Sequence, residues 1–410
     1  MPYTKEKNKS KVIDRKEMED RRQDRQKQRK QKLIILAAAL ACILILVFFI
    51  AGGYERLLDL FGIERDISVK PSITEFNVDL KGTTLITGVG ETTIVYDENG
   101  MTGYSKDGKW KWNETCVFSN PSVYTYDKFV IFADIGGTAA YAFNENGNTW
   151  RFGGNNKIKA VFAGSSDCVC IIHEESEYLS AVSVYKYDGK TSSLSELFTR
   201  KFSSHYMLSG SVSDDGKQIA LSGVYPSGGE TAGIISFLRV SDGEIVSNEV
   251  IQNQIYVKEF YAENGSLFAV NSDSVRILKC NMSISSENDI NTEVWNRESK
   301  QEKIIDAVLL NNKQCVIAVG SENSSKTNVI GYTTKGKESL NIEISGNIIG
   351  MDSVGDGLLV YTEKDVYLYN EKGLLIGTQE AGFAIEEAVC TGSRYVTVRG
   401  EGKLLSVSFK

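Results

Sequence analysis

A short motif recurs along the chain at the ends of runs of β-forming residues. It consists of an aromatic residue, three mostly polar residues and a glycine, and it occupies Tyr104–Gly108, Phe143–Gly147, Tyr185–Gly189, Tyr332–Gly336 and Tyr369–Gly373, with a degenerate copy at Arg239–Gly243. Glycine adopts positive φ at little steric cost, so each glycine predicts a hairpin turn. We expect each aromatic residue to pack between neighbouring sheets. The motif therefore predicts a chain built from repeated antiparallel units.

The spacing of the motif identifies the kind of repeat. Successive turn glycines lie 39, 42, 54, 93 and 37 residues apart, and the chain ends 37 residues after Gly373. The longest interval holds two units, the first of which turns near Ser283 without a glycine. A period of about 40–45 residues with four short strands per unit is typical of a β-propeller. We predict an all-β propeller of eight blades; seven blades are the alternative, because the fourth and fifth units are irregular.

The two ends of the repeated segment predict how the ring closes. The last unit, Ile385 to Lys410, has room for only three strands. One further strand is left over upstream, near Ile73–Leu80, before the first blade begins at about Leu85. If this upstream strand completes the last blade, it covers an edge that would otherwise be open to aggregation.

An apolar segment precedes the repeats. The residues from Leu33 to Ala51 form an uninterrupted apolar run of 19. At about 1.5 Å per residue the run spans roughly 28 Å, close to the ~30 Å hydrocarbon core of a bilayer. Residues 1–32 carry thirteen Lys or Arg against six acids, whereas residues 54–410 hold 33 basic and 47 acidic groups. Basic residues beside an apolar span stay on the cytoplasmic side, so we predict a single-pass protein of the cell membrane with its N-terminus in the cytoplasm.

The predicted domain order is a basic cytoplasmic tail (1–32), a transmembrane helix (33–53), a juxtamembrane linker (54–66) and an extracytoplasmic β-propeller (67–410). A cleaved signal peptide is the alternative for the apolar run. Signal peptides have apolar cores of about 7–15 residues and a small-x-small cleavage site, and we favour an anchor because this run is longer and lacks a good site. The tail either attracts anionic lipid head groups or only sets the topology.

Two repeats carry a tryptophan after the turn. Tyr104-Ser-Lys-Asp-Gly108-Lys-Trp110 and Phe143-Asn-Glu-Asn-Gly147-Asn-Thr-Trp150 resemble the repeats of the pyrroloquinoline-quinone-like, or BamB-like, propeller family. The layout also resembles membrane-anchored propellers of unknown function from Gram-positive bacteria. Later repeats replace the tryptophan with aliphatic residues, so the resemblance implies the fold of residues 67–410 rather than quinone chemistry. Its non-enzymatic branch, the propeller lipoprotein of outer-membrane assembly, implies that the chain binds other proteins.

Residues able to carry catalysis are few and scattered. His173 and His205 are the only histidines, and we interpret both as surface or capping residues rather than as bases or metal ligands. We expect Asp214–Gly216 to form a turn and Glu174–Glu175 a hairpin edge. The sequence contains no phosphate loop or complete dinucleotide fingerprint, and the acidic character of residues 54–410 argues against nucleic acid. We predict no catalytic residue, cofactor or metal site, and no enzymatic activity.

Six cysteines follow the apolar run. An even number outside the cytoplasm suggests disulfides. Nearly all of them, however, lie within apolar strands, a context that suits small buried hydrophobic residues, so we expect mostly free thiols. Cys168 and Cys170 are two residues apart and should share one face of a strand. The six are Cys116, Cys168, Cys170, Cys280, Cys315 and Cys390.

Two insertions, Val224–Gly233 and Ser283–Lys303, lengthen the fourth and fifth units. Loops carry function more often than blade cores do, so the candidate partner-binding residues are Tyr225 and Trp295. The other tryptophans are expected to pack between blades; they are Trp110, Trp112 and Trp150.

The function predicted from these features is that of a non-enzymatic binding or scaffold module in the cell envelope. Its partners would be the lipid bilayer, through residues 33–53, and an envelope protein or wall polymer, but not nucleic acid. The alternative is an extracellular carbohydrate-active hydrolase or lyase that uses carboxylates at the propeller centre. A sensor that signals through the cytoplasmic tail is a third reading.

Overall fold

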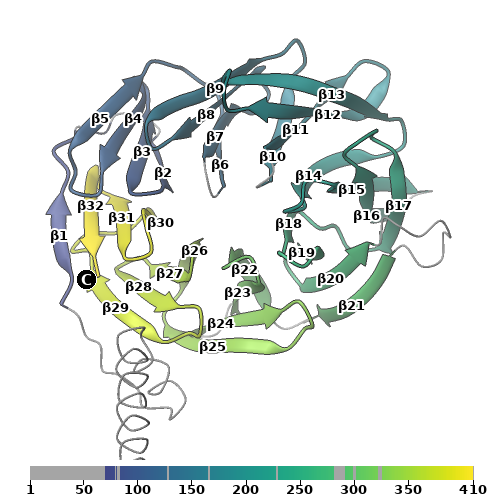
Figure 1. Cartoon of the computed structure of the whole chain (residues 1–410). Coiled ribbons are helices and arrows are strands. Elements are labelled where there is room, and N and C mark those ends of the chain that lie inside the picture. The colour runs from purple at the N-terminus through teal and green to yellow at the C-terminus, as the bar shows by residue number, and fades with distance from the viewer. Residues whose placement is uncertain are drawn as a thin grey trace, which may run out of the picture. The chain divides into compact units, whose positions relative to one another are not determined.

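The computed structural model describes residues 70–409, except 79, 81–83, 127–128, 165–166, 228–229, 281–290, 299–301 and 322–325. The described part forms eight antiparallel four-stranded sheets arranged as a ring (Figure 1). The predicted all-β propeller with eight blades is therefore confirmed. Within the described residues, no helix combines the length and apolarity needed to cross a bilayer. The predicted tail, membrane helix and linker, residues 1–66, lie outside the described part.

Each blade is a meander of four strands. Blade 1 holds β2 (Leu85–Val89), β3 (Thr92–Asp97), β4 (Gly100–Ser105) and β5 (Trp110–Glu114). Blade 2 holds β6 (Pro121–Thr125), β7 (Val130–Asp134), β8 (Ala139–Asn144) and β9 (Gly147–Gly153). Blade 3 holds β10 (Ile158–Ala163), β11 (Cys168–Glu175), β12 (Tyr178–Asp188) and β13 (Ser193–Phe202). Blade 4 holds β14 (Tyr206–Val212), β15 (Gln218–Ser227), β16 (Glu230–Arg239) and β17 (Ile245–Gln252).

The second half of the ring has the same organisation. Blade 5 holds β18 (Lys258–Tyr261), β19 (Ser266–Val270), β20 (Ser274–Cys280) and β21 (Asn291–Glu298). Blade 6 holds β22 (Lys303–Leu310), β23 (Gln314–Gly320), β24 (Lys326–Thr333) and β25 (Glu338–Ser345). Blade 7 holds β26 (Ile348–Val354), β27 (Gly357–Thr362), β28 (Asp365–Asn370) and β29 (Leu375–Glu380). Blade 8 holds β30 (Glu387–Cys390), β31 (Tyr395–Gly400), β32 (Lys403–Ser408) and β1 (Ser72–Glu75).

The position of a strand within its blade follows from its hydrophobic pattern. The first strand of each blade lies nearest the axis of the ring and the fourth lies outside (Figure 1). Second strands such as β19 and β27 are buried along their whole length, because neighbouring blades cover both faces of the sheet. The outermost strand β13 is instead mostly exposed. Apolar side chains of the described residues form eight clusters, one at each interface between neighbouring blades.

The ring closes as the sequence predicts. Strand β1 pairs antiparallel with β32, placing Ser72 opposite Ser408, so the upstream strand completes the last blade. Closure also brings β2 very near β30. A Cβ atom on Gly88 of β2 would lie 1.9 Å from the carbonyl oxygen of Cys390, a distance that only glycine tolerates.

The recurring glycines lie at the turn between the third and fourth strands. Five of the six have positive φ, as predicted; they are Gly108, Gly147, Gly243, Gly336 and Gly373. The prediction is wrong for Gly189, because the longer turn of blade 3 places its positive φ at Ser192 instead. The turn predicted near Ser283 lies outside the described residues. Blade 8 needs no such turn, since its third and fourth strands come from opposite ends of the described segment.

The motif aromatics pack between blades, as predicted. Phe143 joins the cluster between blades 1 and 2, and Tyr369 joins the one between blades 6 and 7. Trp112 stacks on Phe143 with ring centroids 5.4 Å apart, and Trp150 is buried between blades 2 and 3. The prediction is wrong for Trp110, which is 62% exposed because it begins the outermost strand of blade 1.

All six described cysteines are buried free thiols, as expected. Cys168 and Cys170 enter the same apolar cluster, so they share a strand face. Burial raises the pKa of Cys280 to about 11 and that of Cys315 to about 12. Both thiols therefore stay protonated at neutral pH and act as apolar side chains.

Candidate functional site

The two predicted partner-binding residues lie on strands rather than in loops. The insertion around Tyr225 lengthens β15 and β16, whose pairing continues from Val224–Gly233 to Ser227–Glu230. Trp295 lies in β21, the outermost strand of blade 5, opposite Ile277. The expectation that these insertions form loops is wrong at Tyr225 and Trp295, because both residues lie in paired strands. The two residues belong to different blades, and the structure does not bring them together.

His173 is buried rather than at the surface, so that interpretation is wrong. It lies within β11, and its Nε2 atom is 2.8 Å from the Ser183 hydroxyl on the adjacent strand. Ser183 in turn lies 2.6 Å from the Thr199 hydroxyl. Sequence reasoning missed this pair because the partners are brought together only by the register of β11, β12 and β13. The group is a polar chain inside one blade, with both His173 and Ser183 more than nine-tenths buried.

His205 lies in a partly exposed aromatic group between blades 3 and 4. Its ring centroid is 5.1 Å from that of Tyr225 and 6.3 Å from that of Phe202. Burial lowers the pKa of His205, so the ring is neutral at neutral pH. The predicted residue Tyr225 therefore contributes to an aromatic group near the turn of the β15–β16 hairpin.

Three carboxylates on innermost strands hold neighbouring blades together. Asp306 in blade 6 accepts a hydrogen bond from the Met351 amide of blade 7 at 2.8 Å. Asp352 in blade 7 accepts one from the Cys390 amide of blade 8 at 2.7 Å. Glu387 in blade 8 accepts one from the Ile86 amide of blade 1 at 3.1 Å. We call Asp306, Asp352 and Glu387 the carboxylate latches.

The environment of these acids is unusual for charged groups. Burial raises the pKa of Asp352 to about 6, although two backbone amides donate to its carboxylate. Burial likewise raises the pKa values of Glu387 and of Glu259, the acid on the innermost strand of blade 5. Asp306 is partly neutralised by Lys258, whose Nζ lies 2.9 Å from its Oδ1. The predicted central carboxylates therefore exist, and their first role is structural.

The innermost strands also expose aliphatic side chains at equivalent positions. Strands β14, β22 and β26 each carry a β-bulge near their first residues, and the bulged residues are Leu208, Ile305 and Ile349. Val257 stands in the same place immediately before β18. Their exposed fractions run from 42% for Leu208 to 56% for Val257. A bulge frees one residue from regular pairing and can redirect its side chain.

These four residues form a continuous series over blades 4 to 7. We call Leu208, Val257, Ile305 and Ile349 the apolar arc. Each lies near the turn between the second and third strands of its blade, so all four lie at the same end of the ring. Because the innermost strands surround the axis (Figure 1), the residues curve around one end of it. Tyr206, 48% exposed at the start of β14, extends the series.

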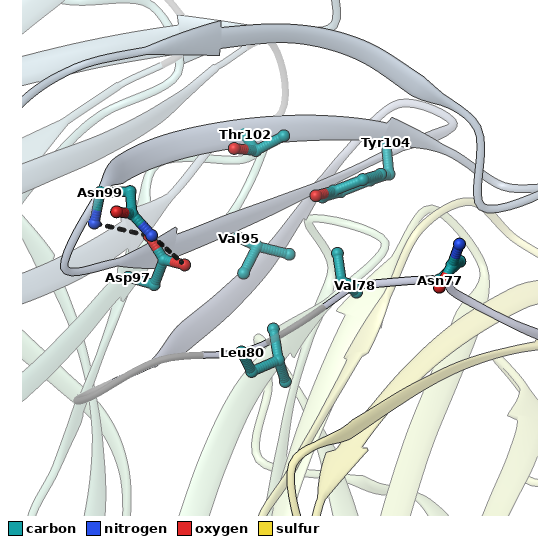
Figure 2. A pocket seen from close by; sticks show the side chains of 8 residues that line it. All are labelled: Asn77, Val78, Leu80, Val95, Asp97, Asn99, Thr102 and Tyr104. Carbon is teal, nitrogen blue, oxygen red and sulfur yellow. Dashed lines mark hydrogen bonds between the residues drawn. The ribbon is translucent and has the colours of Figure 1, made fainter.

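A small pocket lies beside blade 1. Figure 2 shows Asn77, Val78 and Leu80, from the segment after β1, facing strands β3 and β4 across a cavity of about 270 Å³. Asp97 in its wall bonds to the Asn99 amide at 2.8 Å, which stabilises the turn between those strands. Typical small-molecule pockets are about 300–1,000 Å³ and mostly apolar. This pocket is smaller and its lining is mainly polar.

Comparison with known proteins places the chain in a family and a fold. A model described as "Family of unknown function (DUF5711)" matches residues 66–405. No curated protein matches the sequence.

Solved structures with similar folds share little sequence with the chain. Chaetomium thermophilum Sqt1, bound to the N-terminus of ribosomal protein L10, aligns with a TM-score of 0.55 and 11% identity over 82% of this chain and 99% of that one. The C-terminal WD40 domain of Sif2 aligns with a TM-score of 0.55 and 12% identity, over 82% and 98%. BamB from Moraxella catarrhalis aligns with a TM-score of 0.49 and 12% identity, over 82% and 98%. At these identities the likeness concerns the fold alone.

Proposed function

The chain belongs to a family of unknown function, DUF5711, and we therefore propose its role from the geometry of the propeller. We propose that it is a non-enzymatic protein that binds a partner protein through the apolar arc. Exposed apolar patches on soluble domains commonly mark protein-binding surfaces. The arc repeats over four consecutive blades at matched positions, whereas scattered exposed residues would need no explanation. This series is the observation that carries the proposal.

The rigidity of the ring suits such a role. Each blade packs on both neighbours and the terminal strands are paired, so the arc residues keep fixed spacings. Preorganised surfaces lose less conformational entropy on binding. Sqt1, which shares the fold, is described bound to the N-terminus of another protein, and this supports a protein partner here as well.

The proposal includes location in the cell envelope. The apolar run from Leu33 to Ala51 and the basic tail before it support a single-pass anchor with the propeller outside the cytoplasm. An anchored propeller would raise the effective concentration of its binding surface for partners at the same membrane. Alkaline extraction of membranes tests this part: the full chain should stay in the pellet, and a chain lacking residues 33–53 should not.

Site-specific photocrosslinking in intact cells tests the binding role. A photoreactive residue at Ile349 of the full chain should capture one identified envelope protein. The matched control is the same residue at Leu375, which is similarly exposed on the outermost strand of the same blade. Equal capture at both positions, or none at Ile349, would contradict the proposal. Captured material that proves to be carbohydrate would point instead to a wall polymer.

A second candidate function is that of a carbohydrate-active hydrolase or lyase. The observation in its favour is Asp352, because a carboxyl whose pKa is raised to about 6 by burial can act as a general acid. A screen of glycan substrates would compare the wild-type chain with Asp352→Asn. Turnover that falls about a hundredfold or more in the variant, with the fold retained, would favour this function.

A further inference from the structure

The innermost strands differ in charge between the two halves of the ring. Strands β18, β22, β26 and β30 of blades 5 to 8 carry four acids and two lysines. Strands β2, β6, β10 and β14 of blades 1 to 4 carry one lysine and no acid. Three of the four arc residues belong to the acidic half. Ile305 and Ile349 therefore share strands with Asp306 and Asp352, and Val257 immediately precedes the strand that carries Glu259.

The cations of the acidic half are already engaged. Lys258 pairs with Asp306, and Lys303 pairs with Asp273 on the neighbouring blade. Two of the four acids are paired: Asp306 with Lys258, and Glu387 with Arg399. Asp352 and Glu259 form no ion pair among the described residues. Asp352 receives only backbone amides there, and Glu259, 6% exposed, accepts a hydrogen bond from the Ser209 hydroxyl through Oε2, whereas its Oε1 has no hydrogen-bond partner.

The sequence positions of the two groups interleave. Ile305 immediately precedes Asp306, Val257 lies two residues before Glu259, and Ile349 lies three before Asp352. An incoming chain that covers the arc would thus pass within a few residues of Glu259, Asp306 and Asp352. An acidic partner would meet Glu259 and Asp352, which have no ion-pair partner among the described residues, and this disfavours it.

We propose that the apolar arc and the neighbouring acids bind a basic, aliphatic protein segment, with apolar side chains on the arc and a lysine or arginine directed at the carboxylates. This inference rests on the proposed function and specifies the chemistry of the partner. The aliphatic contacts would supply most of the affinity. The charges would select against acidic segments and make binding sensitive to salt.

Three fluorescent peptides of 12 residues serve as probes: leucine alternating with lysine, leucine with glutamate, and serine with lysine. Fluorescence anisotropy measures their binding to the full chain in phosphatidylcholine nanodiscs, with empty nanodiscs subtracted because basic apolar peptides also bind lipid. The leucine–lysine peptide should bind saturably, and about tenfold tighter than either other peptide. Its affinity should fall as salt rises from 50 to about 500 mM.

Variants locate the binding. The double variant Ile305→Ser, Ile349→Ser should bind the leucine–lysine peptide about tenfold more weakly, whereas Leu375→Ser should leave the affinity for this peptide unchanged. Thermal melting verifies that each variant is folded. Equal binding of the leucine–glutamate peptide, or no effect of the double variant, would overturn the inference. If peptide binding fails while crosslinking at Ile349 still captures a protein, only the partner chemistry is wrong. If both fail, the proposed function fails as well.

Discussion

Two stretches of the ring hold their blades together by different chemistry. Between blades 1 and 2, aromatic rings meet: Trp112 stacks on Phe143, and the Tyr96 ring lies 6.1 Å from that of Phe132. From blade 6 round to blade 1, each innermost strand carries a carboxylate latch to the next blade in addition to the apolar cluster of its interface. The apolar cluster at the closing interface between blades 8 and 1 has only four buried residues among those described.

The difference shows that one backbone repeat accepts two kinds of interface. Aromatic pairs contribute through buried area and ring geometry, and they leave the innermost strands free of charge. Latches contribute through hydrogen bonds to charged acceptors, which are strong but require burial of an acid. The latched stretch therefore carries Asp306 and Asp352, two of the acids that lie close to arc residues in the sequence.

The largest effect is expected in the aromatic half. Phe143→Ala removes a fully buried ring from the interface between blades 1 and 2 and should lower the free energy of unfolding by about 3–5 kcal/mol. Chemical denaturation of the full chain measures the change. Trp110→Ala is the control, because that exposed residue should contribute within about 0.5 kcal/mol. Equal losses of unfolding free energy in the two variants would show that the buried ring contributes no more to stability than the exposed one.

The latched half is tested by Asp306→Ala. The substitution removes the acceptor of the Met351 amide and the partner of Lys258, and it should cost about 2–3 kcal/mol. Asp356→Ala, at an exposed turn of blade 7, is the control and should be nearly neutral. A loss below about 0.5 kcal/mol for Asp306→Ala would mean that the latch adds no stability.

The two halves should also differ in their response to pH. The pKa of Asp352 is about 6 in the folded chain against an ordinary value of 3.8, so between these values the folded state binds more protons than the unfolded state. The stabilisation contributed by the protonated Asp352 side chain is therefore present below about pH 4 and is lost as the pH rises to about 6. The loss in unfolding free energy is at most about 3 kcal/mol.

Melting curves of the wild-type chain and Asp352→Asn from pH 4 to 7 measure this contribution. The wild-type melting temperature should decline relative to that of the variant across the window. Parallel profiles would contradict the role of Asp352. Phe143→Ala should shift the whole profile without changing its shape, because it removes no titrating group.

The smallest effect on stability is expected at the apolar arc. Ile305→Ser combined with Ile349→Ser exchanges partly exposed side chains, so the free energy of unfolding should change by about 1 kcal/mol or less. Denaturation of the same preparation used for peptide binding measures it. A loss comparable to that of Phe143→Ala would show that the arc belongs to the core and is not a free surface.

Much of the architecture could be predicted because it depends on local patterns. The glycine of the motif needs a positive φ wherever a tight turn joins two strands, and this predicted the turns at Gly108 and Gly373. The spacing of those turns predicted the blades. The shortage of one strand after Ile385 predicted that β1 would close the ring.

Two of the misses, at Trp110 and His173, depend on how strands pair rather than on neighbouring residues. Trp110 and Trp112 both follow the same turn, and regular alternation would place them on one face of β5. A register shift in the pairing of β4 with β5 separates them instead, so that Trp110 is exposed and Trp112 lies against blade 2. His173 is buried because strand register brings Ser183 beside it. Neither outcome can be read from the neighbouring residues in the sequence.

The sequence by itself determined the repeat and the closure and narrowed the number of blades to seven or eight, because turn residues and strand-forming runs act over a few positions. Only the tertiary structure decided which acids became latches, since each latch needs an amide of the next blade within hydrogen-bonding distance. It also decided the apolar arc. Leu208, Val257, Ile305 and Ile349 resemble ordinary core residues in the sequence. Leu208, Ile305 and Ile349 are exposed because the innermost strands of their blades each add a bulged residue beside the axis, and Val257 occupies the matching place just before β18.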